Sequence, residues 1–440
     1  MYGEPIVGLC PGQGAYRPGV LSQAWAGGDE VVREVFAAVD EAHRARTGRT
    51  VSAVVFADPA PSLEDLVAHH ADELQLTIYA TAVVAHRALA ARGTTPDLLV
   101  GHSLGEISAL VAAGVFSVAD GAAIVCDRNE VLRAHAPEGG MLALRCGRDR
   151  AELLVTLLAA PDLVLAVDNA EEQSVLSGPA KALASAAEVA RALGISAGPL
   201  GSPYGFHHPA LVPAGRELAR RVAGYRRHPF AVPVHSPILG RRYRDGDDLA
   251  ALLGLQLSQP VGFRETLARL SADGARVFVE LGAGEVLTKL VRGALPLASV
   301  VPTFAAPGPL SDLDAVAAHL AGVPVPRVEA PRPLVPATPE PTAAPAPALE
   351  PTAAPAPAPD RTAALARLRE LYADTLEYPV EVLTEDASLE ADLGVDSMRQ
   401  TELMTQIRTL FDLPAPPPGF RGTELDTLGK IADYITAARP

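Results

Sequence analysis

A proline- and alanine-rich segment divides this 440-residue chain into two unequal parts. Between Pro331 and Asp360 there are 11 prolines, and the nine-residue run that begins at Glu340 recurs from Glu350. Proline lacks a backbone N–H and fixes φ, so the segment suits neither helix nor sheet and favours extended polyproline II. At about 3.1 Å per residue, such a spacer reaches up to about 90 Å. We therefore predict two folded parts, with residues 327–360 as a mobile linker between them.

The composition limits the class of protein. Hydrophobic residues make up 48% of the chain, enough for a sizeable core. The net charge of −15 argues against nucleic acid as a partner. The most apolar stretch, residues 109–126, is interrupted by glycine and aspartate, so we expect no membrane span. Three widely spaced cysteines and an N-terminus without a secretory pattern predict a cytoplasmic protein with no disulfide framework and no metal site.

Short apolar runs alternate with helical patterns in residues 1–326, which we predict to form one domain. Residues 5–10 and 97–101 have the pattern of buried strands, and residues 74–91 and 106–114 that of helices. This alternation is typical of an α/β fold with a mainly parallel sheet.

Residues 139–201 follow a different order within that domain. Their pattern predicts strand, helix, strand, strand, helix and strand, which is the order of a ferredoxin-like unit. We predict an inserted ferredoxin-like subdomain.

The second part, residues 361–440, has the pattern of a small helical bundle, with apolar residues at helical spacing in 363–376, 397–411 and 427–438. From Asp360 to Pro440 there are 15 acidic and 8 basic residues, a net charge of −7. This charge has two interpretations: an ordinary solubilising surface, or an acidic module steered toward basic patches on several enzymes.

The run Gly-His-Ser-Leu-Gly at 101–105 stands where a predicted strand enters a predicted helix. The two glycines allow a sharp turn that exposes the hydroxyl of Ser103, while the next backbone N–H faces the same point. The positive end of the helix dipole favours an oxyanion there. The pattern predicts that Ser103 is a nucleophile.

A nucleophilic serine needs a base to accept its proton. His102 adjoins Ser103, but its side chain would point away at such a turn. His207 and His208 lie about a hundred residues further on, after the inserted subdomain. From the residues alone, either of these two could be the base.

Residues 1 to about 305 resemble the malonyl-CoA:carrier-protein acyltransferases of fatty acid and polyketide synthesis. The matching motifs occur in the family's order and at about its spacing: Pro11-Gly-Gln-Gly, Gly-His-Ser-Leu-Gly-Glu, Asn169 before Val-Leu-Ser-Gly, Phe206-His207, and Phe278-Val-Glu-Leu-Gly-Ala-Gly. The resemblance implies a hydrolase-like α/β acyltransferase with a parallel sheet and the inserted ferredoxin-like subdomain.

The same resemblance implies roles for individual residues. The catalytic histidine falls on His207 and not on His208. The backbone N–H groups of Gln13 and Leu104 would form the oxyanion hole. A backbone carbonyl orients the histidine in this family, and Gln259 stands where asparagine is usual.

The resemblance also bears on the acyl group. Arg128 falls on the family's arginine that pairs with the free carboxylate of a malonyl-type substrate, although alone it could be a snorkelling residue at a helix end. Leu104 and Phe206 resemble malonyl-selective enzymes, whereas Tyr204 resembles the methylmalonyl-selective type. We expect Phe206 and Tyr204 to contact the substrate. The expected unit is malonyl, with methylmalonyl or an unusual extender unit as alternatives.

Residues 361–438 resemble an acyl carrier protein. Asp396-Ser397 begins the predicted second helix and matches the family's attachment signature, although the pair would also serve as a helix N-cap. The resemblance implies a small four-helix carrier domain in which a phosphopantetheinyl transferase attaches 4′-phosphopantetheine covalently to Ser397.

These observations predict a ping-pong acyltransferase in polyketide-type biosynthesis. Ser103, with His207 as base, would take the acyl group from acyl-CoA, and the phosphopantetheine thiol would then take it from the serine. A second hypothesis is a hydrolase that passes wrong acyl groups to water, and a third is a binding module with a vestigial Ser103. Since no ketosynthase or reductase pattern lies in the chain, we expect ketosynthase or other synthase modules as partners.

Overall fold

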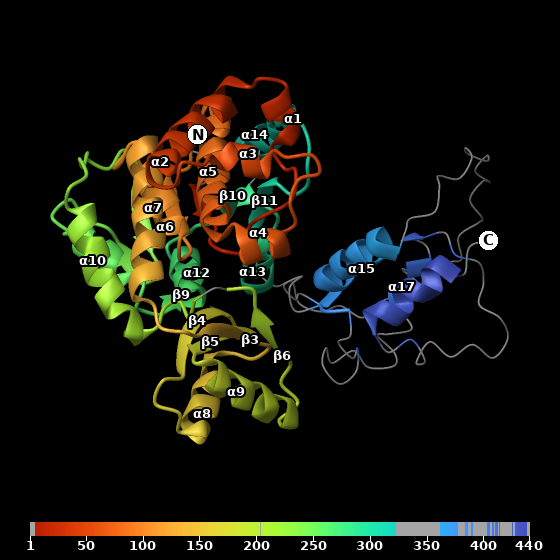
Figure 1. Cartoon of the computed structure of the whole chain (residues 1–440). Coiled ribbons are helices and arrows are strands. Elements are labelled where there is room, and N and C mark those ends of the chain that lie inside the picture. Colours follow the sequence, from red (N-terminus) through yellow and green to blue (C-terminus); the bar gives the residue numbers. More distant parts are fainter. Residues whose placement is uncertain are drawn as a thin grey trace, which may run out of the picture.

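The computed structural model describes residues 5–202, 204–322, 361–376 and 427–437, together with isolated residues between 383 and 425 (Figure 1). The predicted linker at 327–360 and Ser397 lie outside the described residues.

A six-stranded sheet forms the centre of the larger part. In spatial order its strands are β11 (Ser299–Phe304), β10 (Val277–Ala283), β1 (Ile6–Cys10), β2 (Leu98–Gly101), β7 (Val234–Ser236) and β8 (Arg241–Arg242). All adjacent pairs are parallel except β7 and β8. Every residue of β2 and β10 is buried, as expected for parallel strands covered on both faces. The predicted mainly parallel α/β fold is confirmed.

Helices surround this sheet. The long α5 (Ala71–Ala90) is buried over most of its length and contacts β10, which explains why most of its residues are apolar. The other helices are α1 (Ser22–Ala26), α2 (Glu30–Thr47), α3 (Val51–Val55), α4 (Leu63–His69), α6 (Gly105–Ala112), α7 (Val118–His135), α10 (Val212–Val222), α11 (Leu249–Leu255), α12 (Phe263–Ala272), α13 (Val286–Ala294) and α14 (Leu313–Gly322), with 3₁₀ turns η1 (Pro209–Leu211) and η2 (Leu310–Asp312).

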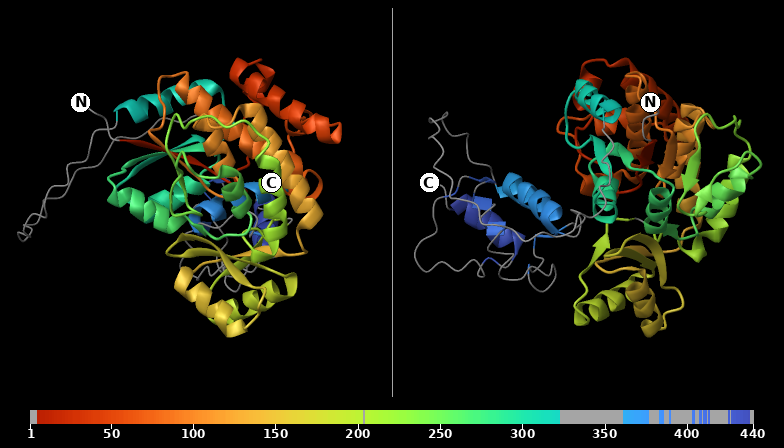
Figure 2. Two further views of the ribbon diagram at one scale, coloured as in Figure 1. Left: turned by 90° about the vertical axis from the view of Figure 1, so that its left-hand side faces the viewer. Right: turned by 180° about the vertical axis from the view of Figure 1, so that it is seen from behind.

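The inserted subdomain has the predicted order β-α-β-β-α-β. Its elements are β3 (Gly140–Leu144), α8 (Arg148–Leu158), β4 (Val164–Ala170), β5 (Gln173–Gly178), α9 (Ala180–Ala192) and β6 (Ala197–Leu200). The sheet order is β6-β3-β5-β4-β9, and the two helices lie on the side of this sheet that faces away from the larger part (Figures 1 and 2). Its last strand, β9 (Val261–Gly262), comes from a later part of the chain, so the subdomain is joined to the larger part by a shared strand as well as by its ends.

The second part contains helices α15 (Arg361–Leu376) and α17 (Leu428–Ala437), which contact each other. They share a hydrophobic core that is separate from that of the larger part; it includes Leu368, Tyr372, Leu403, Ile407, Ile431 and Ile435. The helical character of this region agrees with the prediction. None of the helices in the described ranges is long and apolar enough to cross a membrane.

Candidate active site

Ser103 lies on the sharp turn between β2 and α6. Its φ is +53°, a left-handed conformation that non-glycine residues rarely adopt and that is typical of functional turns. A Cβ on Gly101 would lie 2.3 Å from the backbone nitrogen of Glu106, and one on Gly105 would lie 2.0 Å from the carbonyl oxygen of Cys10. Only glycine fits at either position, so the Gly-x-Ser-x-Gly pattern is a steric requirement of this turn.

His207 meets Ser103 across a gap of 104 positions in sequence. The Oγ atom of Ser103 and Nε2 of His207 are 2.7 Å apart, and Nδ1 of His207 is 3.0 Å from the carbonyl oxygen of Gln259. Because a carbonyl only accepts, Nδ1 carries the hydrogen, which leaves Nε2 free to accept the serine proton. His208 is directed elsewhere, with its Nε2 2.9 Å from the carbonyl oxygen of Asp162. These two contacts are the ones expected of a base that accepts the serine proton and of a carbonyl that orients that base.

The electrostatic surroundings keep His207 neutral. Burial, with smaller contributions from His102 and Arg128, lowers the pKa of His207 to about 3. The ring is therefore unprotonated at neutral pH and able to act as a base. Burial also lowers the pKa of His102, whose Nε2 lies 2.8 Å from Oδ1 of Asn169. As expected from the turn, His102 points away from the Oγ of Ser103 and into the wall of the site.

Arg128 is only 2% exposed and projects from α7 toward the site. It donates a hydrogen bond to Oε1 of Gln75, its guanidinium carbon lies 4.9 Å from the ring centre of Phe206, and its Nε has no hydrogen-bond partner. Within residues 5–202 and 204–322, no carboxylate forms an ion pair with it. Burial lowers the pKa of Arg128 to about 10, so it remains charged at neutral pH. A buried cation without an anion is costly, and a ligand carboxylate would supply the missing partner.

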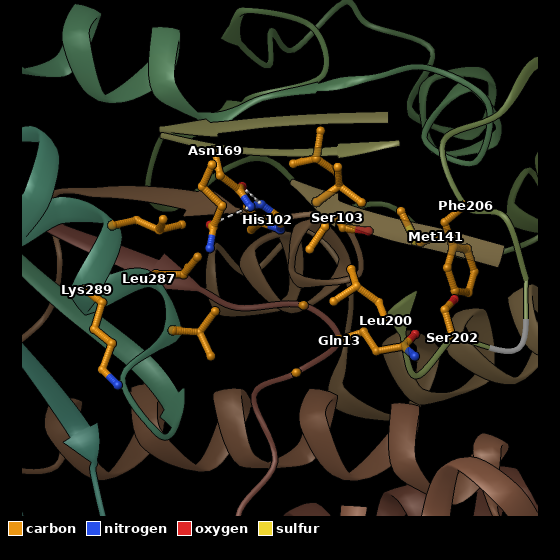
Figure 3. Close-up of a pocket in the computed structure, with 18 of the residues that line it drawn as sticks. Gln13, His102, Ser103, Met141, Asn169, Leu200, Ser202, Phe206, Leu287 and Lys289 are labelled. Atoms are coloured by element: carbon orange, nitrogen blue, oxygen red, sulfur yellow. Dashed lines mark hydrogen bonds between the residues drawn. The ribbon is translucent and has the colours of Figure 1, made fainter. Parts of the chain in front are cut away.

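These side chains open onto one cavity of about 290 Å³ between the larger part and the inserted subdomain. Figure 3 shows Phe206 and Met141 toward one end of the cavity and Lys289 toward the other, with Ser103 between them. About half of the other lining residues have apolar side chains, and the rest are glycines or polar residues such as Gln13, Asn169 and Gln173. A cavity that combines apolar walls with convergent polar groups is typical of a small-molecule site. No group of three or more possible metal ligands occurs among the described residues.

The remaining predicted site residues occupy distinct positions. Gln13 and Leu104 line the cavity beside Ser103, and the side chain of Gln13 donates to the carbonyl oxygen of Gly201 at 2.9 Å. Phe206 also lines the cavity. Of the residues that the structure describes, Tyr204 is not among those lining it; its ring packs edge-on against that of Phe206, with the ring centres 5.8 Å apart. Tyr204 is thus placed to shape the cavity through Phe206 rather than by direct contact.

Two glutamines contribute to the site and were not predicted. Gln256 donates from Nε2 to the carbonyl oxygen of Ser103 at 2.7 Å, on the same segment that carries Gln259. Gln75 holds one side of Arg128. Gln75 could have been singled out from the sequence, because it is a polar residue inside a long, mainly apolar helix. The short segment around Gln256 has no such pattern.

Comparison with known proteins decides the family. The acyl transferase domain family matches residues 7–311. The chain belongs to this acyltransferase family. A second family, the phosphopantetheine attachment site, matches residues 366–435, so the acyltransferase carries a region of the type that holds covalent 4′-phosphopantetheine.

The relatives of this acyltransferase include a malonyl CoA-acyl carrier protein transacylase of Synechocystis, 34% identical over 50% of this chain and 74% of the relative. The polyketide biosynthesis protein ThaF of Burkholderia thailandensis is 38% identical over 46% of this chain, but over only 17% of its own length. Among solved structures, a malonyl-CoA:acyl carrier protein transacylase from Xanthomonas oryzae matches with a TM-score of 0.64 and 28% identity, covering 72% of this chain and 99% of that one. The predicted family, fold class and acyltransferase activity are confirmed.

Proposed function

We propose that this acyltransferase moves a malonyl-type group from coenzyme A, through an ester on Ser103, to a phosphopantetheine thiol carried on Ser397. The observation that carries the choice of acyl group is Arg128, a buried cation with an unpartnered Nε in the same cavity as Ser103. A malonyl group ends in the carboxylate that this guanidinium lacks. The names of the transacylase relatives support the same choice.

The geometry supports the proposed first half of the reaction. Nε2 of His207 accepts the proton of Ser103 as Oγ attacks the thioester carbonyl, and the carbonyl of Gln259 holds Nδ1–H so that the ring keeps this tautomer. The backbone N–H groups of Gln13 and Leu104 are proposed to bind the oxyanion. His207 then returns the proton to the departing sulfur of coenzyme A.

The second half uses the same residues in the reverse sense. A covalently bound phosphopantetheine supplies the thiol that accepts the acyl group. His207 would remove the proton of that thiol and return it to the Oγ of Ser103 as the acyl–oxygen bond breaks, and the same backbone N–H groups would stabilise the second oxyanion. The 290 Å³ cavity opens between two parts of the protein and exposes the Oγ of Ser103 to an entering arm. The paired Ser103 and His207 argue against a vestigial site, and the comparisons do not favour a hydrolase.

We also propose the domain limits 1–326, 327–360 and 361–440, with the inserted subdomain at about 139–201. A cytoplasmic location is supported by three free, buried cysteines. A phosphopantetheinyl transferase would modify Ser397, and synthase modules would receive or supply the acyl groups, as the polyketide synthases among the relatives suggest.

The choice of acyl group can be tested at Ser103 alone, in a Ser397→Ala background. In Arg128→Ala, intact-mass analysis should show malonyl loading reduced by about 100-fold or more, with acetyl loading changed far less. Arg133→Ala is the matched control, because Arg133 lies on the same helix but pairs with Asp72 near the surface. An unchanged ratio of malonyl to acetyl loading in Arg128→Ala would contradict the proposal.

A further inference from the structure

Two consecutive residues of strand β4 in the inserted subdomain contact two segments of the larger part that carry or contact the catalytic pair. Oδ1 of Asn169 lies 2.8 Å from Nε2 of His102, the neighbour of Ser103 (Figure 3). Both carboxylate oxygens of Asp168 lie 3.1 Å from Nε of Arg264. The first contact is made to the turn that carries Ser103. The second is made to a segment of the larger part that also contains Gln259, whose carbonyl oxygen contacts Nδ1 of His207.

That segment is short and has a contact at each end. At its start, Gln256 donates to the carbonyl oxygen of Ser103, and three residues later the carbonyl of Gln259 accepts Nδ1–H of His207. It then forms β9, which pairs in parallel with β4 so that Val167 faces Val261 and Asp168 faces Gly262. Arg264 follows in the first turn of α12. The orienting carbonyl therefore lies between a contact to the nucleophile and a contact to the inserted subdomain.

The ion pair adds to a connection that also includes the buried side chains of Val261 and Phe263 and a hydrogen bond from the backbone N–H of Gly262 to the carbonyl oxygen of Pro237. Since β9 has only two residues, its ladder with β4 supplies few hydrogen bonds to fix the position of the segment. The side chain of Asp168 is 4% exposed, whereas that of Arg264 is 40% exposed and has room to move outward if the pair is broken. The single Nε–H of Arg264 is shared between the two oxygens of this buried carboxylate, and this charge-assisted contact restricts both backbones.

We propose that Asp168 and Arg264 are positioning residues for His207. Their ion pair holds β9 against β4 and thereby keeps the carbonyl of Gln259 at hydrogen-bond distance from Nδ1. Without it, Nδ1–H loses a fixed acceptor, and the ring can rotate or take the tautomer in which Nε2 carries the hydrogen and cannot accept the proton of Ser103. The inference rests on the proposed role of His207 as the base.

The test compares Asp168→Asn, Arg264→Gln and the double variant in malonyl transfer to the holo-carrier. A misplaced orienting group should lower kcat roughly tenfold while KM for malonyl-CoA stays within about twofold. The double variant should be no slower than either single one, because the two residues act as one unit. Arg264→Lys, which keeps the charge, should recover part of kcat. Asp247→Asn is the control: it breaks the Arg241–Asp247 pair, whose carboxylate is also mostly buried and which does not line the cavity.

A spectroscopic readout separates positioning from stability. In histidine labelled with ¹⁵N, the hydrogen-bonded Nδ1–H of His207 should give a downfield proton signal that is absent from His207→Ala and weakened in Asp168→Asn. The inference is overturned if both single variants keep the wild-type kcat and this signal, even if their melting temperatures fall. Failure of the proposed function would look different, because the wild-type protein itself would then not form a malonyl ester at Ser103.

Discussion

Ser103 and His207 both adopt left-handed backbone conformations, with φ of +53° and +56°, but they are held in different ways. Ser103 is fixed locally, by a turn whose two glycines touch the backbones of Glu106 and Cys10. His207 is fixed from a distance, by the carbonyl of Gln259 on a segment that is itself tied to the inserted subdomain. Thus the conformation of Ser103 is set mainly by its own turn, with added contacts from Gln256 and, through His102, from Asn169, whereas the ring of His207 is oriented by a carbonyl on a distant segment.

Removing the base should have the largest effect. His207→Ala is expected to slow acylation of Ser103 by about 10³- to 10⁴-fold, since the serine loses its proton acceptor. His208→Ala should slow it only a few-fold, because His208 contacts Asp162 and the backbone N–H of Ala210 instead. Rapid-quench measurement of the acyl-serine checks both; equal losses would mean that the two histidines had been assigned wrongly.

Disturbing the turn that carries Ser103 should have the second-largest effect. In Gly105→Ala the new Cβ would lie 2.0 Å from the carbonyl oxygen of Cys10, so the turn must move. We expect the free energy of unfolding to fall by about 3 kcal/mol, with at least a tenfold loss of acylation in the folded protein. Urea unfolding and active-site titration measure the two effects. Gly246→Ala, where a Cβ meets nothing within 4 Å, should change neither.

The stability of the protein should fall in acid because His207 is buried. The pKa of His207 is lowered to about 3, while an unfolded histidine titrates near 6.5. Below about pH 6.5 the unfolded chain therefore binds a proton that the folded protein does not, and stability is lost down to about pH 3. Between pH 7 and pH 5, this group lowers the free energy of unfolding by about 2 kcal/mol. Urea unfolding of His207→Ala should show a correspondingly smaller loss; the same loss as in the wild type would contradict the burial argument.

Gln256→Ala should have the smallest effect, because it removes one hydrogen bond to the carbonyl oxygen of Ser103 and leaves the glycine turn intact. We expect kcat to fall about tenfold or less, with KM nearly unchanged. Steady-state kinetics with malonyl-CoA check this. A loss as large as that in His207→Ala would show that the nucleophile is not held by its own turn.

The sequence was sufficient to predict the turn that holds Ser103 but not the distant segment that orients His207. The strand, the turn at 101–105 and the following helix were predicted because one short pattern specifies all three. His207 and His208 could not be separated by their residues, since the contact that distinguishes them joins positions 104 residues apart. The resemblance to a family, not the pattern, indicated His207 and the carbonyl of Gln259.

Other features could not be predicted from sequence patterns. β9 has two residues and therefore no periodicity, so neither its place in the small sheet nor the ion pair that follows it was predicted. Arg128 lies inside α7 and not at a helix end, and whether its guanidinium pointed into the protein or along the surface depended on packing against Gln75 and Phe206. Tyr204, which was expected to contact substrate, is not among the described residues that line the cavity, and its ring packs edge-on against that of Phe206.

A malonyl group should pass through Ser103 before it reaches Ser397. Intact-mass analysis of the holo-protein after addition of malonyl-CoA tests it directly, with Ser103→Ala and Ser397→Ala as the two decisive variants. We predict malonylation of both sites in the wild-type protein, of Ser103 alone in Ser397→Ala, and of neither site in Ser103→Ala. A Ser103→Ala protein that still loads Ser397 from malonyl-CoA at the wild-type rate would show that the acyl group does not pass through Ser103.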